Sequence, residues 1–366
     1  MATKDIRSGD LIIEVPYQLL ITRAKAISSL GSWAATLSSH QAIALYLILE
    51  KSKGIRSPWY EYIRVLPERF DSITSNMIDF LPENVRVDLE RQKEKFERDY
   101  AAIEQLQATS NAYNPISSNE FLWGWSCVNT RCIYFKASNC QLSFSSDENI
   151  AIAPMLDFLN HSSCAKIMGE FNQQSNCYQI TTMTTIKKGE EVFINYGPHD
   201  NFRLLIEYGF TIPNNPFNYV SMDEEFLSLS LPDEDDTIKQ YKLNILTQAG
   251  FMGDYTLREK EISFRLLTAL RLHVLHPFIP SSTHAQSLIA RWKDTLIGRL
   301  DKINEENDQL VFDYLERMCQ TTLNKADIVM NNLSSELSRN GTFHIYQIWD
   351  ESVEILKSVI DLCHAK

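Results

Sequence analysis

APMLDFLNHSS, residues 153–163, is an apolar stretch that three polar residues interrupt: Asp157, Asn160 and His161. Taken alone, the pattern is best explained by a buried capping site in which Asp157 and Asn160 satisfy backbone donors. His161 would then be a histidine of the core. The stretch by itself therefore favours packing over chemistry.

A second polar cluster follows further along the chain, with Asn195-Tyr196-Gly197-Pro198 first and Tyr208 after it. The preceding residues, 178–196, alternate in character around the turn Lys187-Lys188-Gly189-Glu190, which predicts a β-hairpin. On that interpretation a strand ends at a Gly-Pro turn and Tyr208 is a packing residue. This cluster also has a purely structural explanation when it is taken alone.

Composition and charge indicate a folded protein of 366 residues, 44% hydrophobic and 22% charged. Two domains, or one large domain with insertions, are expected for this length. The net charge of −12 argues against a protein that binds nucleic-acid backbones, and it favours a basic protein as the partner. The N-terminus lacks a signal-peptide core, and the longest apolar run, residues 42–49, is too short to cross a bilayer. We expect neither nucleic-acid binding nor membrane association.

The cysteines and histidines give no indication of a metal site. The seven cysteines are odd in number and include no C-x-x-C pair, which predicts reduced thiols in a cytoplasmic or nuclear protein, or one found in both compartments. His273 and His276 are three residues apart without a third ligand, so we expect surface or half-buried histidines. The motifs of nucleoside triphosphatases, dinucleotide-binding enzymes, α/β-hydrolases and zincins are also absent from the sequence.

Hydrophobic periodicity divides the chain into a mixed first part and a helical second part. Short strands are predicted at residues 10–15 and 18–22, helices between about residues 41 and 110, and a further helical block at residues 120–134. After residue 216, an acidic run begins a helix that Gly250 ends. Amphipathic helices are predicted at residues 259–275, 283–300, 309–336 and 346–363. The residues after 216 are therefore expected to form an all-helical module.

Four segments, taken in order, resemble a known family: residues 1–22, FLWGWSCVNTRCIYF at 121–135, APMLDFLNHSS at 153–163 and GEEVFINYGPHDNFRLLIEYGF at 189–210. The chain is similar, over roughly its whole length, to the SET-domain protein methyltransferases of the Rubisco large-subunit methyltransferase type. The resemblance implies an α+β fold whose β-rich SET core contains a pseudoknot-like threading. It places the core at residues 1–36 and 118–212, a helical insertion at 37–117, and an all-helical substrate-binding domain at 213–366.

The resemblance also implies S-adenosylmethionine as the cofactor. It assigns Arg131, Asn160 and His161 to cofactor binding. Asp157 is placed near the cofactor and the substrate or, alternatively, behind the Asn-His loop that it would hold. Arg131 can pair with the cofactor carboxylate in a bidentate way. These four residues are the cofactor site that the sequence predicts.

By the resemblance, Tyr196 corresponds to the catalytic tyrosine of the family. The resemblance also implies that Tyr208 lines the same lysine channel, where an aromatic face tolerates a methylated ammonium. Relatives that methylate actin histidine lack the tyrosine of this Y-G-F element, so Tyr208 favours lysine. Phe171 lies near a further channel tyrosine of some members, but no role is carried over to it. The implied reaction is N-methylation of lysine in a protein substrate, histone or non-histone, by a monomer.

Family members carry a G-x-G-L segment just upstream of the residues that Met1-Ala2-Thr3-Lys4 resembles, and this sequence begins there without it. The glycines of that segment let the backbone approach the cofactor closely. We therefore expect one wall of the cofactor site to be missing. A catalytically impaired SET-like protein that binds a basic peptide is the resulting alternative, and a purely structural helical scaffold is a second one.

Overall fold

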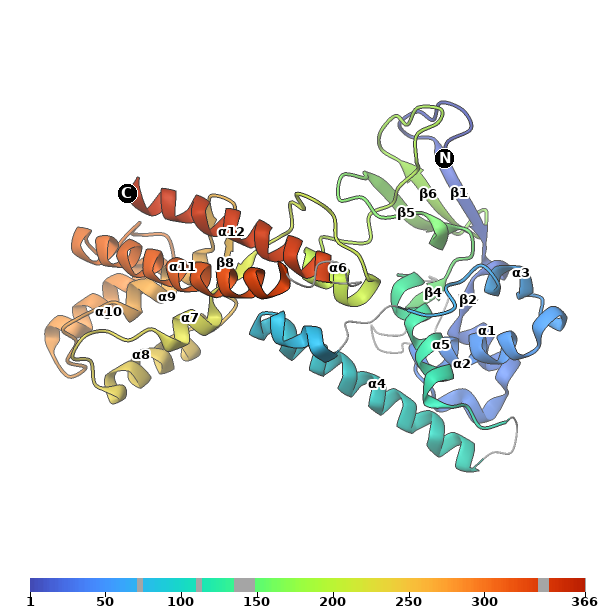
Figure 1. The fold of residues 1–366 in the computed structure, drawn as a ribbon, viewed down its shortest axis with the longest axis horizontal. Coiled ribbons are helices and arrows are strands. Elements are labelled where there is room, and N and C mark those ends of the chain that lie inside the picture. Colours follow the sequence, from blue (N-terminus) through green and yellow to red (C-terminus); the bar gives the residue numbers. More distant parts are fainter. Residues whose placement is uncertain (71–74, 110–113, 135–148, 335–341, 366) are drawn as a thin grey trace. The chain divides into compact units, whose positions relative to one another are not determined.

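The structure, a computed structural model, describes residues 1–70, 75–109, 114–134, 149–334 and 342–365. The chain divides into two units, and Figure 1 shows its helices and strands in sequence colours. The first unit contains residues 1–72, 87–199 and 203–209, and the second contains residues 73–86, 200–202 and 210–366. Each unit has a hydrophobic core of its own.

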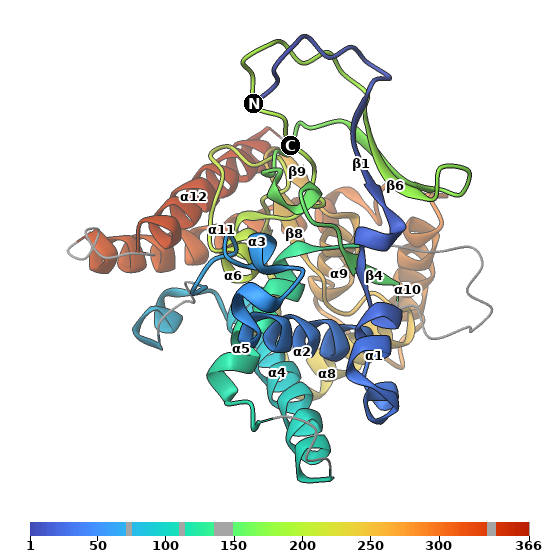
Figure 2. The same ribbon diagram turned by 90° about the vertical axis from the view of Figure 1, so that its right-hand side faces the viewer.

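Two three-stranded antiparallel sheets form the β-rich part of the first unit. One has the strand order β1-β6-β5 and the other the order β2-β4-β3. Figure 2 shows β1 and β6 side by side. Both sheets therefore join segments that are far apart in the sequence. Their strands are β1 (Leu11–Pro16), β2 (Ile21–Thr22), β3 (Cys132–Tyr134), β4 (Ile150–Ile152), β5 (Ile167–Asn172) and β6 (Cys177–Thr182).

The strand predicted at residues 10–15 is confirmed as β1, whereas the hairpin predicted at residues 178–196 is wrong. The ladder partners of β6 are β1 and β5, and not the segment EVFINYG. The backbone N–H of Ile194 donates to the carbonyl of Asn160, and the carbonyl of Ile194 accepts from Ser162. Because the Asn-His loop takes these backbone groups, Ile194 forms a parallel bridge with His161 instead of extending β6.

Three helices before residue 209, α1, α2 and α5, begin at side-chain caps. Ser38 starts α2 and Ser117 starts α5, each in a capping box that satisfies the first backbone donors. α2 and α5 pack closely at Gly124, where an added Cβ would lie 2.7 Å from the carbonyl oxygen of Ala44. The helices are α1 (Arg23–Leu30), α2 (Ser39–Ser52), α3 (Tyr60–Ile63), α4 (Glu83–Thr109), α5 (Ser118–Arg131) and α6 (Asn201–Tyr208).

Short 3-10 turns connect these elements. The turn Leu156–Phe158 follows β4 and leads into the Asn-His loop, so it positions the residues discussed below. The predicted helical block at residues 120–134 is confirmed as far as Arg131, after which the chain enters β3. Other 3-10 turns within the described residues lie at Tyr17–Leu19, Ser32–Thr36, Gly54–Arg56 and Ser75–Phe80.

The second unit is largely helical, as predicted, but it also contains a small sheet. β7 (Val220–Ser221), β8 (Thr256–Arg258) and β9 (Glu261–Ile262) pair in that order, which corrects the all-helical expectation. A helix predicted from residue 259 starts only at Phe264, because residues 256–262 form the β8-β9 pair. The predicted ends at residues 110 and 336 lie outside the described residues. The helices are α7 (Asp223–Ser228), α8 (Asp236–Gln248), α9 (Phe264–His273), α10 (Thr283–Leu296), α11 (Glu305–Ser334) and α12 (Thr342–His364).

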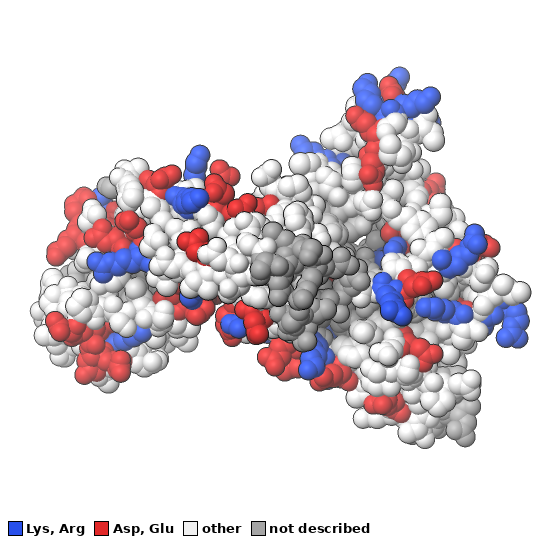
Figure 3. Space-filling view, in the orientation of Figure 1, with Lys and Arg blue, Asp and Glu red and all other residues white. Residues whose placement is uncertain are grey.

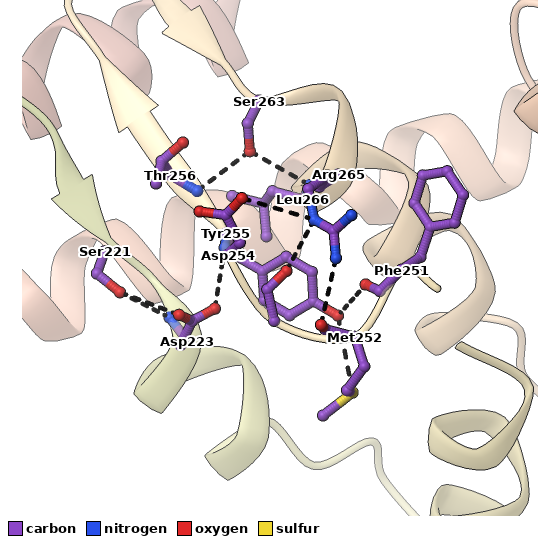
Figure 4. Close-up of polar contacts among 11 residues, drawn as sticks. Ser221, Asp223, Phe251, Met252, Asp254, Tyr255, Thr256, Ser263, Arg265 and Leu266 are labelled. Atoms are coloured by element: carbon purple, nitrogen blue, oxygen red, sulfur yellow. Dashed lines mark hydrogen bonds and ion pairs between the residues drawn. The ribbon is translucent and has the colours of Figure 1, made fainter. Parts of the chain in front are cut away.

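A turn around Gly253, which has a φ of 77°, connects α8 to β8. Figure 4 shows Arg265 of α9 reaching this turn. The Arg265 Nε donates to the carbonyl of Gly253 at 2.9 Å, and its Nη2 donates to that of Met252 at 3.2 Å. The hydroxyl of Tyr255, a residue only 1% exposed, donates to the carbonyl of Phe251 at 2.8 Å. The bonds of Arg265 tie the turn before β8 to α9, and the bond of Tyr255 closes the turn itself.

The surface of the second unit is rich in acidic side chains. Figure 3 shows more Asp and Glu than Lys and Arg over its helices on the face drawn, in keeping with the net charge of −12. None of the helices in the described ranges has the length and apolar character needed to cross a membrane. Among the cysteines within those ranges, Cys164 is exposed and Cys132 is partly buried, and the others are buried. Cys140 lies outside the described residues.

Candidate functional site

The two polar clusters of the sequence lie side by side in the first unit. Ile194 N–H donates to the carbonyl of Asn160 at 2.9 Å, and Ser162 N–H donates to the carbonyl of Ile194 at 3.0 Å. This parallel bridge places His161 directly against the residues that follow Ile194. The contact spans about thirty residues of sequence, so local periodicity could not have indicated it.

His161 is 7% exposed and its ring holds the backbone of Tyr196. The N–H of Tyr196 donates to His161 Nδ1 at 3.1 Å, which makes Nδ1 the acceptor and leaves the ring proton on Nε2. Burial, with the nearby His199, lowers the pKa of His161. The ring is therefore neutral at neutral pH, as the hydrogen bond requires.

Tyr196 and Tyr208 form a tilted aromatic pair next to His161, with 34° between the planes of the two tyrosine rings. The centroids of the two tyrosine rings are 5.0 Å apart, and the rings of Tyr196 and His161 are 5.1 Å apart. The hydroxyl of Tyr196 donates to the carbonyl of Leu159 at 2.9 Å. Burial raises the pKa of Tyr196, and it raises the pKa of Tyr208 to about 12. Both phenols are therefore protonated at neutral pH and act through hydrogen bonds and ring faces.

A tight turn fixes the position of Tyr196 from the other side. The side chain of Asn195 accepts a hydrogen bond from the N–H of Gly197 at 2.8 Å. His199 Nε2 lies 3.1 Å from the carbonyl of Tyr196. Gly197 has a φ of 137°, and an added Cβ would lie only 2.7 Å from His199 Nε2. The turn therefore requires glycine at this position.

Arg131, the last residue of α5, forms a buried ion pair with Asp157. Arg131 Nη1 lies 3.0 Å from Asp157 Oδ2 and 3.1 Å from the backbone carbonyl of the same residue. The side chain of Asp157 is 0% exposed and that of Arg131 is 17% exposed. Burial raises the pKa of Asp157, against hydrogen bonds from Tyr62 and Arg131 that lower it. The direct contact with the guanidinium favours the ionised carboxylate.

Two polar atoms of this pair are buried without a hydrogen-bond partner among the described residues, Arg131 Nε and Asp157 Oδ1. Nearby, Asn160 Nδ2 donates to Glu191 Oε1 at 2.6 Å. A carboxylate only accepts, so it fixes the Asn160 amide with its NH₂ toward Glu191 and its oxygen facing away. A guanidinium donor and an amide acceptor are complementary to the carboxylate and ammonium of an amino-acid group. S-adenosylmethionine ends in such a group, so these residues fit the predicted cofactor.

The structure thus brings the predicted residues of the first unit into two neighbouring groups. One group contains His161, Tyr196 and Tyr208, and the other pairs Arg131 with Asp157. Asn160 adjoins both groups in the chain. Their assigned roles remain predictions. Phe171, which was given no role, lies in β5 with its ring edge-on to Tyr17 at 6.1 Å.

Three further residues contact the site and were missed by the sequence analysis: Tyr62, Glu191 and His199. Tyr62 donates to Asp157 from α3, 95 residues away along the chain. Glu191 belonged to a presumed hairpin strand, and His199 follows the Gly-Pro turn without any pattern. Nothing in local sequence spacing connects these residues with the loop at 157–161.

Of the two histidines considered for a metal site, His273 is packed differently from what was predicted. His273 is 0% exposed, with its Nε2 3.3 Å from the carbonyl of Leu229 and its ring 5.1 Å from that of Phe226. The expectation of a surface or half-buried histidine is therefore wrong for His273, because α9 carries it into the core. His276 is exposed. Within the described ranges, no three His, Cys, Asp or Glu residues are grouped to hold a metal ion.

Comparison with known proteins finds relatives of the whole chain. The sequence is 30% identical over 348 residues to SET domain-containing protein 4 of Mus musculus, covering 91% of this chain and 76% of the relative. It is 27% identical over 334 residues to ribosomal lysine N-methyltransferase set11 of Schizosaccharomyces pombe, covering 89% of this chain and 80% of that protein. These alignments extend far beyond the short motifs of the site.

A solved structure and a family profile agree on the fold. The SET domain of LSMT bound to lysine and AdoHcy superposes with a TM-score of 0.66 at 20% identity, covering 100% of this chain and 84% of that chain. The likeness shows a shared fold. The profile of the SET domain matches residues 1–197, more than half of the chain. This protein therefore belongs to the SET-domain family.

Proposed function

We propose that this protein is an S-adenosylmethionine-dependent methyltransferase that modifies lysine side chains of protein substrates. The observation that carries the proposal is the aromatic pair of Tyr196 and Tyr208, packed on His161 beside the buried Arg131–Asp157 pair. The names of the relatives point the same way: one is a ribosomal lysine N-methyltransferase, and a solved structure of the same fold holds lysine and AdoHcy.

Four residues are proposed to hold the cofactor, which when bound supplies a methyl group on a sulfonium. Arg131 donates to the carboxylate of the amino-acid end, and the oxygen of Asn160 accepts from its ammonium. Asp157 fixes Arg131 from behind. His161 holds the loop to Tyr196, and its backbone is proposed to contact the cofactor. Charge complementarity at both ends of the amino-acid group fixes its orientation.

Tyr196 and Tyr208 are proposed to line the lysine channel. Methyl transfer needs an unprotonated amine, yet the ordinary pKa of lysine is about 10.4. A narrow channel of aromatic side chains disfavours the ammonium by desolvation, and a neighbouring positive charge lowers its pKa further. Protonated phenols can then orient the amine without competing for its proton. The two tyrosines therefore contribute alignment and a dry environment.

A basic segment of a protein is the substrate that the charge of the chain favours. The sequence contains 47 acidic and 35 basic residues, so a Lys-rich partner, histone or non-histone, is attracted to it. We further propose that the enzyme is a monomer. We also propose that it works in the cytoplasm, the nucleus or both, because the cysteines in the described ranges are free thiols.

The test combines cofactor binding with identification of the product. Calorimetry with S-adenosylmethionine should show binding, and incubation with labelled cofactor and a protein extract should give methyl-lysine by mass spectrometry. Tyr196→Phe should abolish the labelling. The control Tyr255→Phe, which loses a buried hydroxyl bond in the second unit, should leave it unchanged. Absence of cofactor binding would overturn the enzyme proposal, and methylhistidine in place of methyl-lysine would overturn the substrate class.

A further inference from the structure

Tyr62 reaches the cofactor loop from a distant part of the sequence. It lies in α3, and its hydroxyl donates to Asp157 Oδ2 at 2.7 Å across 95 residues of chain. Burial raises the pKa of the Tyr62 phenol, so the hydroxyl stays protonated and remains a donor. The ring of Tyr62 lies edge-on to Trp59 at 6.4 Å and packs on Phe158 at 5.8 Å. The phenol therefore packs against two other aromatic rings.

The carboxylate of Asp157 receives both of its side-chain donors on one oxygen. Oδ2 accepts from Tyr62 and from Arg131, at 2.7 and 3.0 Å. Oδ1 has no partner among the described residues. Because the Asp157 side chain is 0% exposed, water does not compete for Oδ2. Two donors that approach one oxygen from different elements prevent the carboxylate from rotating.

Because the carboxylate of Asp157 cannot turn, the guanidinium of Arg131 is held in place as well. Arg131 Nη1 donates both to Oδ2 and to the backbone carbonyl of Asp157, so one corner of the guanidinium plane is held at two points. The group is planar, and its remaining donors then point in set directions. Arg131 Cζ also lies 5.9 Å from the ring of Phe158, the same ring that Tyr62 packs on. Tyr62 and Arg131 thus share two supports, Asp157 and Phe158.

We infer that Tyr62 is a positioning residue for cofactor binding: through Asp157, it holds Arg131 in the orientation that pairs with the carboxylate of S-adenosylmethionine. This inference rests on the proposed function. Tyr62 does not touch the cofactor in this scheme. Removing its hydroxyl takes one of the two side-chain donors from Asp157 Oδ2 and frees the carboxylate to turn. Arg131 then loses its preset geometry, and binding has to order it again.

The first experiment measures binding of S-adenosylhomocysteine by calorimetry on the full chain. Tyr62→Phe should weaken binding about tenfold, because hydrogen bonds to charged groups are the stronger ones. The control Tyr100→Phe removes a hydroxyl bond to the carbonyl of Ile116 in the same unit and should change the affinity by less than about twofold. With saturating cofactor, kcat of Tyr62→Phe should stay near that of the parent, while KM for S-adenosylmethionine rises.

A double-mutant cycle decides whether Tyr62 acts through Asp157. On the background of Asp157→Asn, the further change Tyr62→Phe should weaken binding by less than about twofold, since its partner is already altered. A second tenfold loss on that background would overturn the inference. Equal affinities of the parent and Tyr62→Phe would also overturn it, while leaving the proposed function intact. A parent chain that binds no S-adenosylhomocysteine would instead refute the proposed function.

Discussion

Replacing Gly197 by alanine would test how firmly the turn after Tyr196 holds that side chain. Gly197 has a φ of 137°, a conformation that L side chains rarely adopt. An added Cβ would lie 2.7 Å from His199 Nε2 and 2.9 Å from its Cε1. Atoms do not pack that closely, so the imidazole of His199 has to move. Its contact with the carbonyl of Tyr196 is then lost.

Two contributions set the expected loss of unfolding free energy. Alanine at this φ costs about 1–2 kcal/mol. The 3.1 Å hydrogen bond between His199 and Tyr196 contributes about 1 kcal/mol. We therefore expect a loss of about 2–3 kcal/mol. We also expect kcat to fall at least tenfold, because a misplacement of about 1 Å can reduce a rate by about a hundredfold.

Gly189→Ala is the matched control. Gly189 also has a positive φ, 89°, but an added Cβ there would have no heavy atom within 4 Å. The Gly189→Ala variant carries the backbone strain without the crowding. Its free energy of unfolding should therefore fall by about 1–2 kcal/mol, and its kcat should stay unchanged. Urea unfolding and methyl-transfer kinetics on the full chain measure both quantities. Equal losses in the two variants, or an unchanged kcat in Gly197→Ala, would show that the turn does not position Tyr196.

Three further predictions concern the cores of the two units. Lys242 is 0% exposed, and it donates to Glu234 Oε1 at 2.5 Å and to the carbonyls of His273 and Leu275. Lys242→Met leaves these acceptors buried without their donor, so it should lower the free energy of unfolding, measured in urea, by about 3–5 kcal/mol. Burial lowers the pKa of His273 from 6.5 to about 4. As the pH falls, this imidazole is therefore protonated in the unfolded chain before it is protonated in the folded chain. Stability should fall by up to about 3 kcal/mol as the pH drops from 6.5 to 4, and His273→Gln should reduce that slope in unfolding measured across this range. Gly124→Ala should cost about 1–3 kcal/mol and lower the melting temperature, because its Cβ would meet the backbone of α2 at 2.7 Å; an unchanged melting temperature would contradict this close packing.

Elements with a strong local pattern could be predicted from the sequence. β1 follows from an apolar run that Pro16 closes, and the long helices of the second unit follow from amphipathic periodicity. Their boundaries shift where a local turn intervenes. α9 starts at Phe264 because the preceding residues turn at Lys260, with a φ of 54°, and pair as β8 and β9.

Long-range pairing could not be predicted in the same way. The segment around Ile194 has strand-forming residues, yet its backbone groups are taken by Asn160 and Ser162. The contact of Tyr62 with Asp157 depends on the placement of α3, which no spacing encodes. The sequence resemblance selected the predicted site residues, whereas their hydrogen-bond partners emerge only from the three-dimensional arrangement. Local patterns specify elements, and tertiary contacts specify which of their side chains meet.

Tyr62 lies within residues 37–117, the segment predicted to be a helical insertion, and this limits how that segment could be exchanged. A chimera that took residues 37–117 from another family member to redirect substrate choice would also replace the donor to Asp157. Such a hybrid would require a hydroxyl at the matching place on its short helix, supported by rings like those of Trp59 and Phe158. Grafts in this family should therefore be screened for cofactor affinity before they are screened for substrate preference.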